Sequence, residues 1–411
     1  MATGTTFSPL SYRPFAFVWM SVMASHFANS ISGVGAQWLM TSLDGRADMV
    51  GLIHSATTLP IMFLALIGGA IADLYDRRRI MLTAQISVAC ISLVLAWLSW
   101  NGLATPWLLI GLTFALGTGI AFFQPAVNAS IQVLVPRSEV SGAIGLNVTG
   151  FNVARTVGPA VGGAIVAAGG AFAAFAVSAV FSLVAAGILF AWKAPAFERT
   201  ITGLRSVFPA IVEGLRAVRD TPQLRSIAIR SFGFTFCGTS IWGLMPIIAR
   251  DIVGGGPERF GILLGALGLG ALIGSALSHE FRRRFSPESL TRTAGIVFAT
   301  MILIIVARPG FTVTMIVLVV GGAFWVQALS GFTVSAQLWA PKALIGRITS
   351  TVSVTTWGGL GVGAWFWGRM AEIVGTPYAI GASAVALALV VAFGLIMPLA
   401  DRPPEAQSPQ G

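Results

Sequence analysis

The sequence predicts an all-α membrane protein of twelve transmembrane helices, arranged as two pseudo-symmetric six-helix bundles. Three observations predict this fold class: long apolar segments, an uneven distribution of basic residues between the loops, and an internal repeat. Of the 411 residues, 55% are hydrophobic and only 10% are charged, whereas roughly 25% of the residues in a soluble domain are charged. A soluble protein of this size would need far more polar surface, so we exclude that class.

Twelve apolar segments are each about long enough to cross a hydrocarbon core of about 30 Å as a helix. They cover residues 15–43, 48–72, 80–100, 106–130, 142–168, 172–192, 226–249, 260–279, 291–306, 311–338, 345–371 and 377–398. The polar stretch 193–222 interrupts them and predicts a cytoplasmic linker between an N-terminal bundle (1–192) and a C-terminal bundle (223–411). Within this linker we predict a short amphipathic helix around Ile211–Val218.

Basic residues lie in short clusters on alternate loops. With the N-terminus in the cytoplasm, the cytoplasmic clusters are Arg13, Arg77–Arg79, Arg137, the linker, Arg282–Arg284, Lys342, Arg347 and Arg402. The opposite side then receives no more than Arg46, Arg250, Arg259, Arg308 and Arg369. Loops rich in lysine and arginine stay in the cytoplasm, so this bias predicts two cytoplasmic termini and an even number of spans. It also explains the net charge of +10 without nucleic acid, because no basic groove or aromatic stacking platform accompanies it.

The two halves repeat with a constant shift of about 205 residues, as transporters built from like-oriented repeats do. The matched pairs include Gln132 with Gln337, Pro136 with Pro341, Gly158 with Gly363, Gly163 with Gly368, and Arg77–Arg79 with Arg282–Arg284. A site between two such halves opens to either side when one half rocks against the other. The alternative is a fused duplication of a passive scaffold.

The loop after the second span carries a glycine, an acid and a basic pair: Gly69, Asp73, Arg77 and Arg78. This order resembles a loop motif of the major facilitator superfamily. The glycine allows two helices to approach closely, and an acid at a helix end pairs with neighbouring arginines. The resemblance implies a conformational latch for one access state. A loop that only sets topology is the alternative.

The fifth span carries small residues around a proline: Gly145, Gly158, Pro159, Gly162 and Gly163. They resemble the antiporter motif of drug exporters in the same superfamily, with Ala154 at one of the motif's glycine positions. Proline removes a backbone hydrogen bond, and the small residues let a kinked helix pack tightly. The resemblance implies export; simple close packing is the alternative.

The run from Leu134 to Gly163 and the segment Tyr12–Phe15 are similar to the branch that includes the bacterial enterobactin exporter and macrolide efflux proteins. This resemblance implies a multi-pass protein of the bacterial cytoplasmic membrane that exports small amphipathic molecules, drugs or siderophore-like compounds, by alternating access and proton antiport. An importer or facilitator of a small nutrient is the alternative. We expect a monomer that binds its small-molecule substrate, protons and the lipid bilayer, with no cofactor, metal or nucleic acid.

In the superfamily that the motifs resemble, the first, fourth, seventh and tenth helices line the central cavity. The candidates for substrate contact on these spans are His26, Asn29, Gln37, Thr113, Gln124, Asn128, Arg230, Trp242 and Gln327. Polar side chains on apolar helices must face protein or water instead of lipid. These side chains either contact substrate or form hydrogen bonds with one another, and the sequence favours neither interpretation.

Two further residues carry hypotheses about charge. Arg155 lies well inside the fifth span, where insertion of a charge costs about 2.5–3.5 kcal/mol. It either attracts an anionic substrate group, belongs to the gate, or bonds to carbonyls of a neighbouring helix. No Asp or Glu lies in the middle of a predicted span, so His26, which can titrate near neutral pH, is the first candidate for proton coupling. A structural hydrogen bond is its alternative.

We expect no enzymatic activity. His279 and Glu280 lack the second histidine of a zinc-protease helix, and the spans hold no Ser/His/Asp or paired-acid set.

Overall fold

The computed structural model describes residues 7–192, 207–341 and 344–399. Residues 193–206 of the linker, with Lys342 and Arg402 of the predicted basic clusters, lie outside these ranges. For Asp73, Gln132 and a few other helical residues, the structure describes the backbone and not the side chain. The described residues form helices and no strands.

The N-terminal half begins with a short 3-10 turn, η1, and continues with helices that match the first six predicted spans to within a few residues. These elements are η1 (Ser8–Ser11), α1 (Arg13–Leu43), α2 (Ala47–Leu74), α3 (Arg77–Trp100), α4 (Pro106–Leu134) and α5 (Val140–Ala191). The helices run past the predicted ends because a helix starts at its cap or first-turn proline, and the apolar run starts later. Asp76, for example, caps α3 by accepting a hydrogen bond from the backbone N–H of Arg78.

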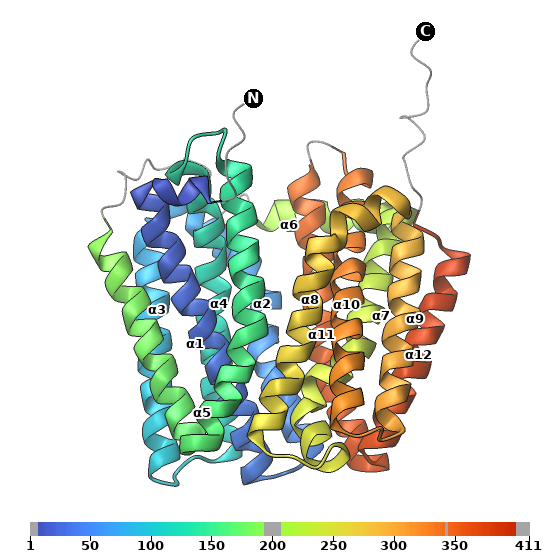
Figure 1. Ribbon diagram of the computed structural model, residues 1–411. Helices are drawn as coiled ribbons and strands as arrows, with labels where there is room; N and C mark the ends of the chain where they lie inside the picture. The colour runs from blue at the N-terminus through green and yellow to red at the C-terminus, as the bar shows by residue number, and fades with distance from the viewer. Residues whose placement is uncertain (1–6, 193–206, 342–343, 400–411) are drawn as a thin grey trace.

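α5 contains two predicted spans joined by a sharp turn. Gly169 and Gly170 leave the helical conformation, and Gly170 has a φ of 68°. A left-handed residue of this kind favours glycine, which has no Cβ atom to clash. The chain therefore reverses here, and α5 crosses the bundle twice, before and after the turn (Figure 1).

The linker contains a helix that confirms the predicted amphipathic segment, and the C-terminal half follows with six more spans. These elements are α6 (Val207–Asp220), α7 (Pro222–Ile247), the short π-helix η3 (Ile248–Ile252), α8 (Pro257–Arg284), α9 (Pro287–Val306), α10 (Phe311–Trp339), α11 (Ile345–Val374) and α12 (Thr376–Ile396). α6 packs mainly against α11, where Glu213 forms an ion pair with Arg347.

By length and composition, nine of the described helices could cross a membrane, with the double span α5 counted once. α1 and α11 are as long but carry more polar side chains, as helices that face protein do. The predicted all-α membrane fold with twelve spans is therefore confirmed.

The two halves pack in matching patterns. In the first half α1 packs on α5, α2 on α4, and α3 on α4 and α5; in the second, α7 packs on α11, α8 on α10, and α9 on α10 and α12. Between the halves, the main interfaces join α2 to α11 and α5 to α8. These four helices therefore carry the connection on which any movement of one half against the other depends.

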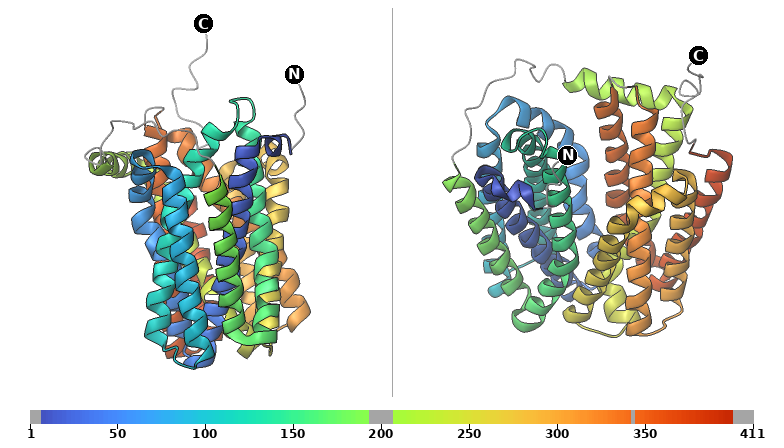
Figure 2. Two further views of the ribbon diagram at one scale, coloured as in Figure 1. Left: turned by 90° about the vertical axis from the view of Figure 1, so that its left-hand side faces the viewer. Right: turned by 45° about the horizontal axis from the view of Figure 1, so that its top comes forward.

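The start of the described chain at η1 and its end after α12 lie toward the same face of the molecule (Figures 1 and 2). We call this the terminal face and the opposite one the distal face. The ribbons of the two halves converge toward the distal face and diverge toward the terminal face (Figure 1). The distal face holds the turn between α1 and α2, the Gly169–Gly170 turn, and the loops after η3 and α11.

Candidate transport site and gate

Glycines bring α5 and α8 into backbone contact. A Cβ atom on Gly163 would lie 2.6 Å from the carbonyl oxygen of Pro257 and 2.8 Å from Cα of Gly261. A Cβ atom on Gly268 would lie 2.6 Å from the carbonyl oxygen of Arg155. Small residues at such crossings allow helices to approach closely and gain van der Waals contact. Part of the proposed antiporter motif thus forms the interface between the two halves.

The other motif glycines face α1 or open space. Gly158 packs against Ser30, and Gly162 packs against Ile31 and Val34. Gly145 has no atom within 4 Å of the position that a Cβ atom would take. The small residues at the end of the motif therefore pack α5 closely on two sides. One side faces α1 of the same half, and the other faces α8 of the other half.

The second interface, between α2 and α11, is equally tight. Ser55 donates a hydrogen bond of 2.6 Å to the carbonyl oxygen of Gly361. A Cβ atom on Gly368 would lie 2.6 Å from the carbonyl oxygen of Ala47, and one on Gly358 would lie 3.2 Å from the sulfur of Met62. These contacts join the halves from the distal face to the middle of the molecule.

Charged groups close the same interface at the distal face. Asp48, which is 9% exposed, pairs with Arg369 of the other half at 3.3 Å and with Arg46 at 2.7 Å. Glu372 accepts a hydrogen bond from the backbone N–H of Ala47. The hydrogen bond and charge of Asp48 raise the pKa of Arg46 above its ordinary value.

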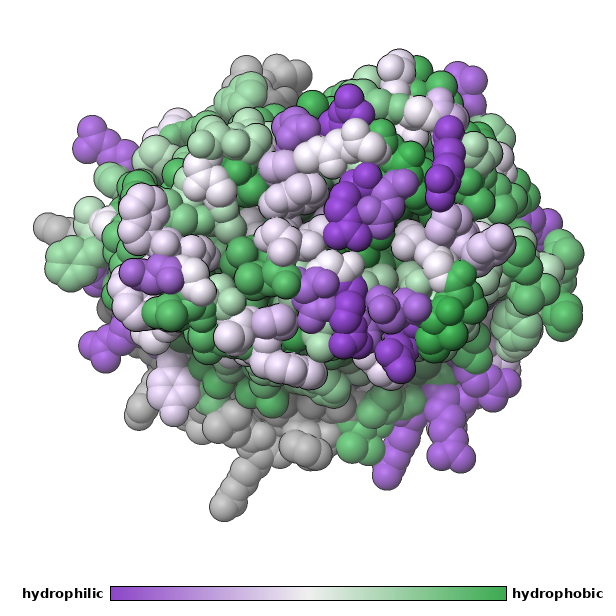
Figure 3. Space-filling view, turned by 90° about the horizontal axis from the view of Figure 1, so that it is seen from below, coloured by the Kyte–Doolittle hydropathy of each residue, from purple (hydrophilic) through white to green (hydrophobic). Residues whose placement is uncertain are grey.

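Hydrophilic side chains gather toward the middle of this face (Figure 3). Arg250 extends from η3 to the carbonyl oxygens of Thr41 and Gly45 in the other half. A cavity of about 330 Å³ lies beside these contacts and is lined by Gly45, Arg250 and Glu372, among others. We call the cross-half contacts made by Asp48, Arg250, Arg369 and Glu372 the distal charge network.

We expect Asp48→Asn to loosen the distal closure. A partly exposed ion pair contributes about 1 kcal/mol, so its loss shifts the balance between closed and open states about fivefold. A reporter cysteine, Ala47→Cys, in a chain without Cys90 and Cys237 should react correspondingly faster with a membrane-impermeant maleimide.

Glu258→Gln is the matched control, because Glu258 is an exposed acid in the first turn of α8 near the same face, and its hydrogen bond from the backbone N–H of Gly256 stays within its own half. Equal labelling rates in Asp48→Asn and the parent would mean that the charge pair does not hold the halves together.

In the middle of the molecule, Arg155 bridges the halves through an aromatic ring. Its guanidinium carbon lies 4.5 Å from the ring centroid of Trp242 on α7. His54 on α2 lies close enough to interact with it electrostatically. All three side chains are half-buried. No carboxylate lies within ion-pair distance of Arg155 among the described residues, so the cation has an aromatic partner and no acidic one.

Several other candidates carry polar atoms that have no partner among the described residues. They are Nε2 of His26, Oε1 of Gln37, Oγ1 of Thr113 and Nε1 of Trp242, all buried. His26 packs edge to face against Phe151 at 5.1 Å. A buried polar atom without a partner is costly and rare, which favours sites that a ligand or water completes.

The remaining polar candidates on α1 and α4 lie in less buried positions. Gln124 donates to Asn128 at 3.3 Å, one turn apart on α4, and Asn128 is exposed. Asn29 on α1 is half-buried. The structure therefore brings Gln124 and Asn128 together, whereas the side chain of Asn29 has no hydrogen-bond partner in the described part of the chain.

Two candidates lie elsewhere than the sequence suggested. Arg230 is 2% exposed and pairs with Glu288 of α9 at 2.6 Å, so it is bound inside the C-terminal half and does not line a central space. Gln327 donates 2.6 Å to the carbonyl oxygen of Gly274 and also meets Ser278, which fixes α10 to α8. For both residues we infer a structural role in place of substrate contact.

The loop between α2 and α3 holds helix ends together within the N-terminal half. Arg77 donates to the carbonyl oxygen of Ala129 at 2.7 Å, and Arg78 donates to those of Leu189 and Phe190. A Cβ atom on Gly69 would meet nothing within 4 Å. The side chain of Asp73 is outside the described part. In this state Arg77 and Arg78 bind carbonyls toward the ends of α4 and α5.

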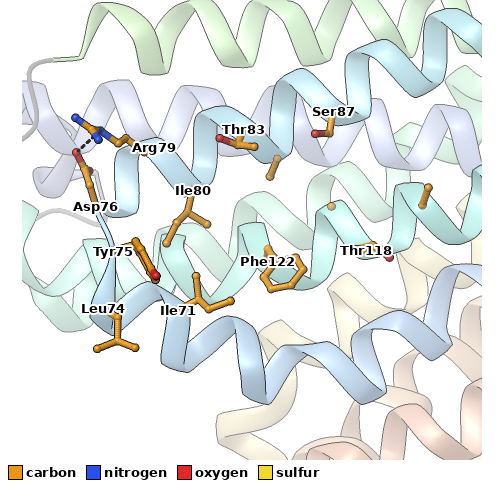
Figure 4. Close-up of a pocket in the computed structure, with 13 residues that line it drawn as sticks. Ile71, Leu74, Tyr75, Asp76, Arg79, Ile80, Thr83, Ser87, Thr118 and Phe122 are labelled. Carbon is orange, nitrogen blue, oxygen red and sulfur yellow. Dashed lines mark ion pairs between the residues drawn. The ribbon is translucent and has the colours of Figure 1, made fainter. Parts of the chain in front are cut away.

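A cavity of about 640 Å³ opens near this loop, between α2, α3 and α4 (Figure 4). Arg79 and Asp76 form an ion pair of 3.7 Å at one end, while Ile71, Ile80 and Phe122 supply apolar walls. The cavity lies within one half and holds none of the substrate candidates predicted from the sequence. It is therefore separate from the region between the halves.

These features define a class of protein: a membrane transporter of two six-helix halves, joined by glycine contacts and a charge network at one end. The chain belongs to the transmembrane secretion effector family of the major facilitator superfamily, whose model matches residues 4–410. The superfamily predicted from the two motifs is thereby confirmed.

The relatives of the chain include efflux proteins. It is 27% identical over 380 residues to the multidrug efflux pump Tap of Mycolicibacterium fortuitum, covering 88% of this chain and 90% of the relative. It is 23% identical over 264 residues to macrolide efflux protein A of Streptococcus pyogenes, covering 64% of this chain and 65% of the relative.

Solved structures share the fold at low identity. A bacterial homologue of the human lysosomal transporter Spinster, inward-facing and unoccupied, matches with a TM-score of 0.74 and 16% identity over 94% of this chain and 96% of that one. A D-xylose–proton symporter matches with a TM-score of 0.76 and 12% identity over 95% and 98%.

Sequence reasoning missed the residues that hold the halves together. Asp48, Arg369 and Glu372 were visible only as charges at helix ends, and Asp48 and Arg369 are 321 positions apart. Gly261 on α8 had no motif to single it out. The internal repeat could have indicated the second interface. It maps the glycine-rich fifth span, which packs on α8, onto α11, which packs on α2.

Proposed function

We propose that the chain is a secondary active exporter of small amphipathic molecules. The observation that carries this proposal is the place of the motif in α5: Gly163 packs on Gly261 of α8 across the two halves. Resemblance of that motif to drug antiporters, and similarity to efflux pumps over most of the chain, support export over import.

We place the protein in the bacterial cytoplasmic membrane with its terminal face in the cytoplasm. The start of α3, the end of α8 and the start of α11 lie toward this face, and they carry Arg77–Arg79, Arg282–Arg284 and Arg347. Basic loops remain in the cytoplasm. The structure then corresponds to a state closed to the outside. Substrate would enter from the cytoplasm or the inner leaflet.

Transport by alternating access requires the distal contacts to open. The close packing of α5 on α8 and of α2 on α11 must separate, together with the pair Asp48–Arg369. Pro159 inside α5 lacks a backbone N–H donor, which weakens the helix at the level of this interface and allows it to bend. On the terminal face, the loop with Gly69, Asp73, Arg77 and Arg78 would latch the opposite state.

The substrate site lies between the halves in the middle of the membrane. Arg155, Trp242 and His54 bring charge and an aromatic face together there, and Gln37 and Thr113 carry buried polar atoms without a partner among the described residues. A mixture of aromatic and polar groups suits a bulky amphipathic molecule.

For proton coupling we propose His26, whose buried Nε2 has no described partner. We expect His26→Gln to remove the acceleration of export by a proton gradient, while exchange without a gradient continues. Proteoliposomes with and without an imposed pH difference measure this. If pH-driven transport stays unchanged in His26→Gln, another group carries the proton.

The export proposal is tested by accumulation assays in efflux-deficient bacteria with a panel of macrolides and dyes. Cells that express the chain should hold several-fold less of one or more compounds than cells without it, and a protonophore should abolish the difference. Equal accumulation across the panel would count against export, and greater accumulation would favour the importer.

A further inference from the structure

Arg155 is a membrane-embedded cation, and no acidic partner is found for it among the described residues. Their acids lie near helix ends, in loops or on the linker helix α6, and the ion pairs they form use other arginines. A charge at this depth is costly unless an opposite charge or water accompanies it. The described part of the fold offers Arg155 neither a carboxylate nor a carbonyl that accepts a hydrogen bond from its guanidinium.

The guanidinium nonetheless has a defined position. Its Cζ atom lies over the indole ring of Trp242, 4.5 Å from the ring centroid. A cation–π contact of this kind leaves N–H donors of the guanidinium available, and these donors fit two oxygens of one anionic group. Its nitrogens are not among the buried atoms without partners, unlike Nε1 of Trp242. The edge of Arg155 therefore faces space that water or a ligand can occupy.

The surroundings add hydrogen-bonding capacity and apolar surface. His54 on α2 interacts electrostatically with Arg155 and contributes further N–H donor capacity. Phe151, one turn earlier on α5 and 44% exposed, lies on the same side of the helix as Arg155. Cationic and aromatic groups thus lie side by side at the interface between the halves.

We propose that Arg155, stacked on Trp242 beside His54, binds an acidic group of the transported molecule. This inference rests on the proposed export function and names its substrate class. The substrates are amphipathic anions in which a carboxylate, sulfonate or phosphate is joined to an aromatic or apolar body. Arg155 binds the acidic oxygens through its edge, while Phe151 and Trp242 contact the body. Because Arg155 belongs to one half and Trp242 to the other, separation of the halves takes the aromatic support away and weakens the hold on the anion.

Two dyes with the same aromatic body test the assignment: 8-anilinonaphthalene-1-sulfonate and N-phenyl-1-naphthylamine, which lacks the sulfonate. Binding of each is measured by fluorescence titration of the purified chain in detergent. We expect Arg155→Gln to weaken binding of the sulfonate about tenfold or more, as loss of a charge-assisted hydrogen bond does. Binding of the neutral dye should change less than twofold. Arg155→Lys should retain part of the sulfonate affinity.

Arg259→Gln is the matched control, because Arg259 also lies over an aromatic ring, Phe311 at 5.3 Å, but near the distal face of the C-terminal half. It should leave both affinities unchanged. Equal losses for both dyes in Arg155→Gln, or no loss for either, would overturn the assignment and leave Arg155 a packing or gating residue.

The failure of this inference and the failure of export are distinguishable. One outcome is that cells expressing the chain expel the neutral dye but not the sulfonate, and that the purified chain does not bind the sulfonate. The proposed anion site is then wrong, and the export proposal stands. If no compound of the panel is expelled, export is wrong, and the dye titrations still decide whether Arg155 binds an anion.

Discussion

Gly163→Val should impair transport severely. The new side chain would meet the carbonyl oxygen of Pro257 and the backbone of Gly261, neither of which can move aside as a side chain could. Overpacking of this kind costs about 1–3 kcal/mol, which shifts the equilibrium away from the distally closed state about 5- to 150-fold. Export should fall by a similar factor, and the Ala47→Cys reporter should label faster.

Gly187→Val is the matched control, because this glycine also lies on α5 and a Cβ atom there would meet nothing within 4 Å. The two variants should be equally abundant in the membrane and equally monodisperse. Normal export in Gly163→Val would show that the α5–α8 contact need not be this close for the transport cycle.

Arg230→Leu should destabilise the fold without changing what the protein binds. Arg230 is 2% exposed and pairs with Glu288, which would be left with Arg292 at 3.0 Å and the backbone N–H of Leu399. Breaking a buried ion pair by removing one partner costs about 3–5 kcal/mol. Thermal unfolding in detergent should show a clear fall in Tm.

Arg283→Leu serves for comparison, because Arg283 pairs with Glu280 at 3.5 Å on the exposed surface, where such pairs contribute little. Its Tm should stay close to that of the parent. A variant Arg230→Leu with normal Tm but altered dye preference would place Arg230 in the substrate site after all.

The fold was predictable because hydropathy, charge distribution and repeat are properties of the sequence alone. The twelve spans follow from the length of the apolar runs, and the turn at Gly169–Gly170 lies where the sequence left a short gap between two of them. Helix ends were less accurate. Hydropathy does not register the prolines and caps, such as Pro257 of α8, at which the helices begin.

The site was predictable only in part, because one sequence shows a residue's type and helix face but not its neighbours. Arg155 and Arg230 look alike in sequence: each is an arginine within an apolar helix. Their difference lies in Trp242 and Glu288, which are remote in the chain and come close only through packing. The same is true of Asp48 and Arg369.

Flux into inside-out proteoliposomes or membrane vesicles, in which the terminal face points outward, distinguishes export by antiport from import. A compound that the accumulation assays identify as substrate is supplied outside, and the lumen is made acidic. We predict that substrate accumulates in the lumen as protons leave, and that Gly163→Val slows this uptake at least several-fold while Gly187→Val does not. Accumulation only when the outside is the more acidic, so that protons and substrate enter together, would contradict export by antiport.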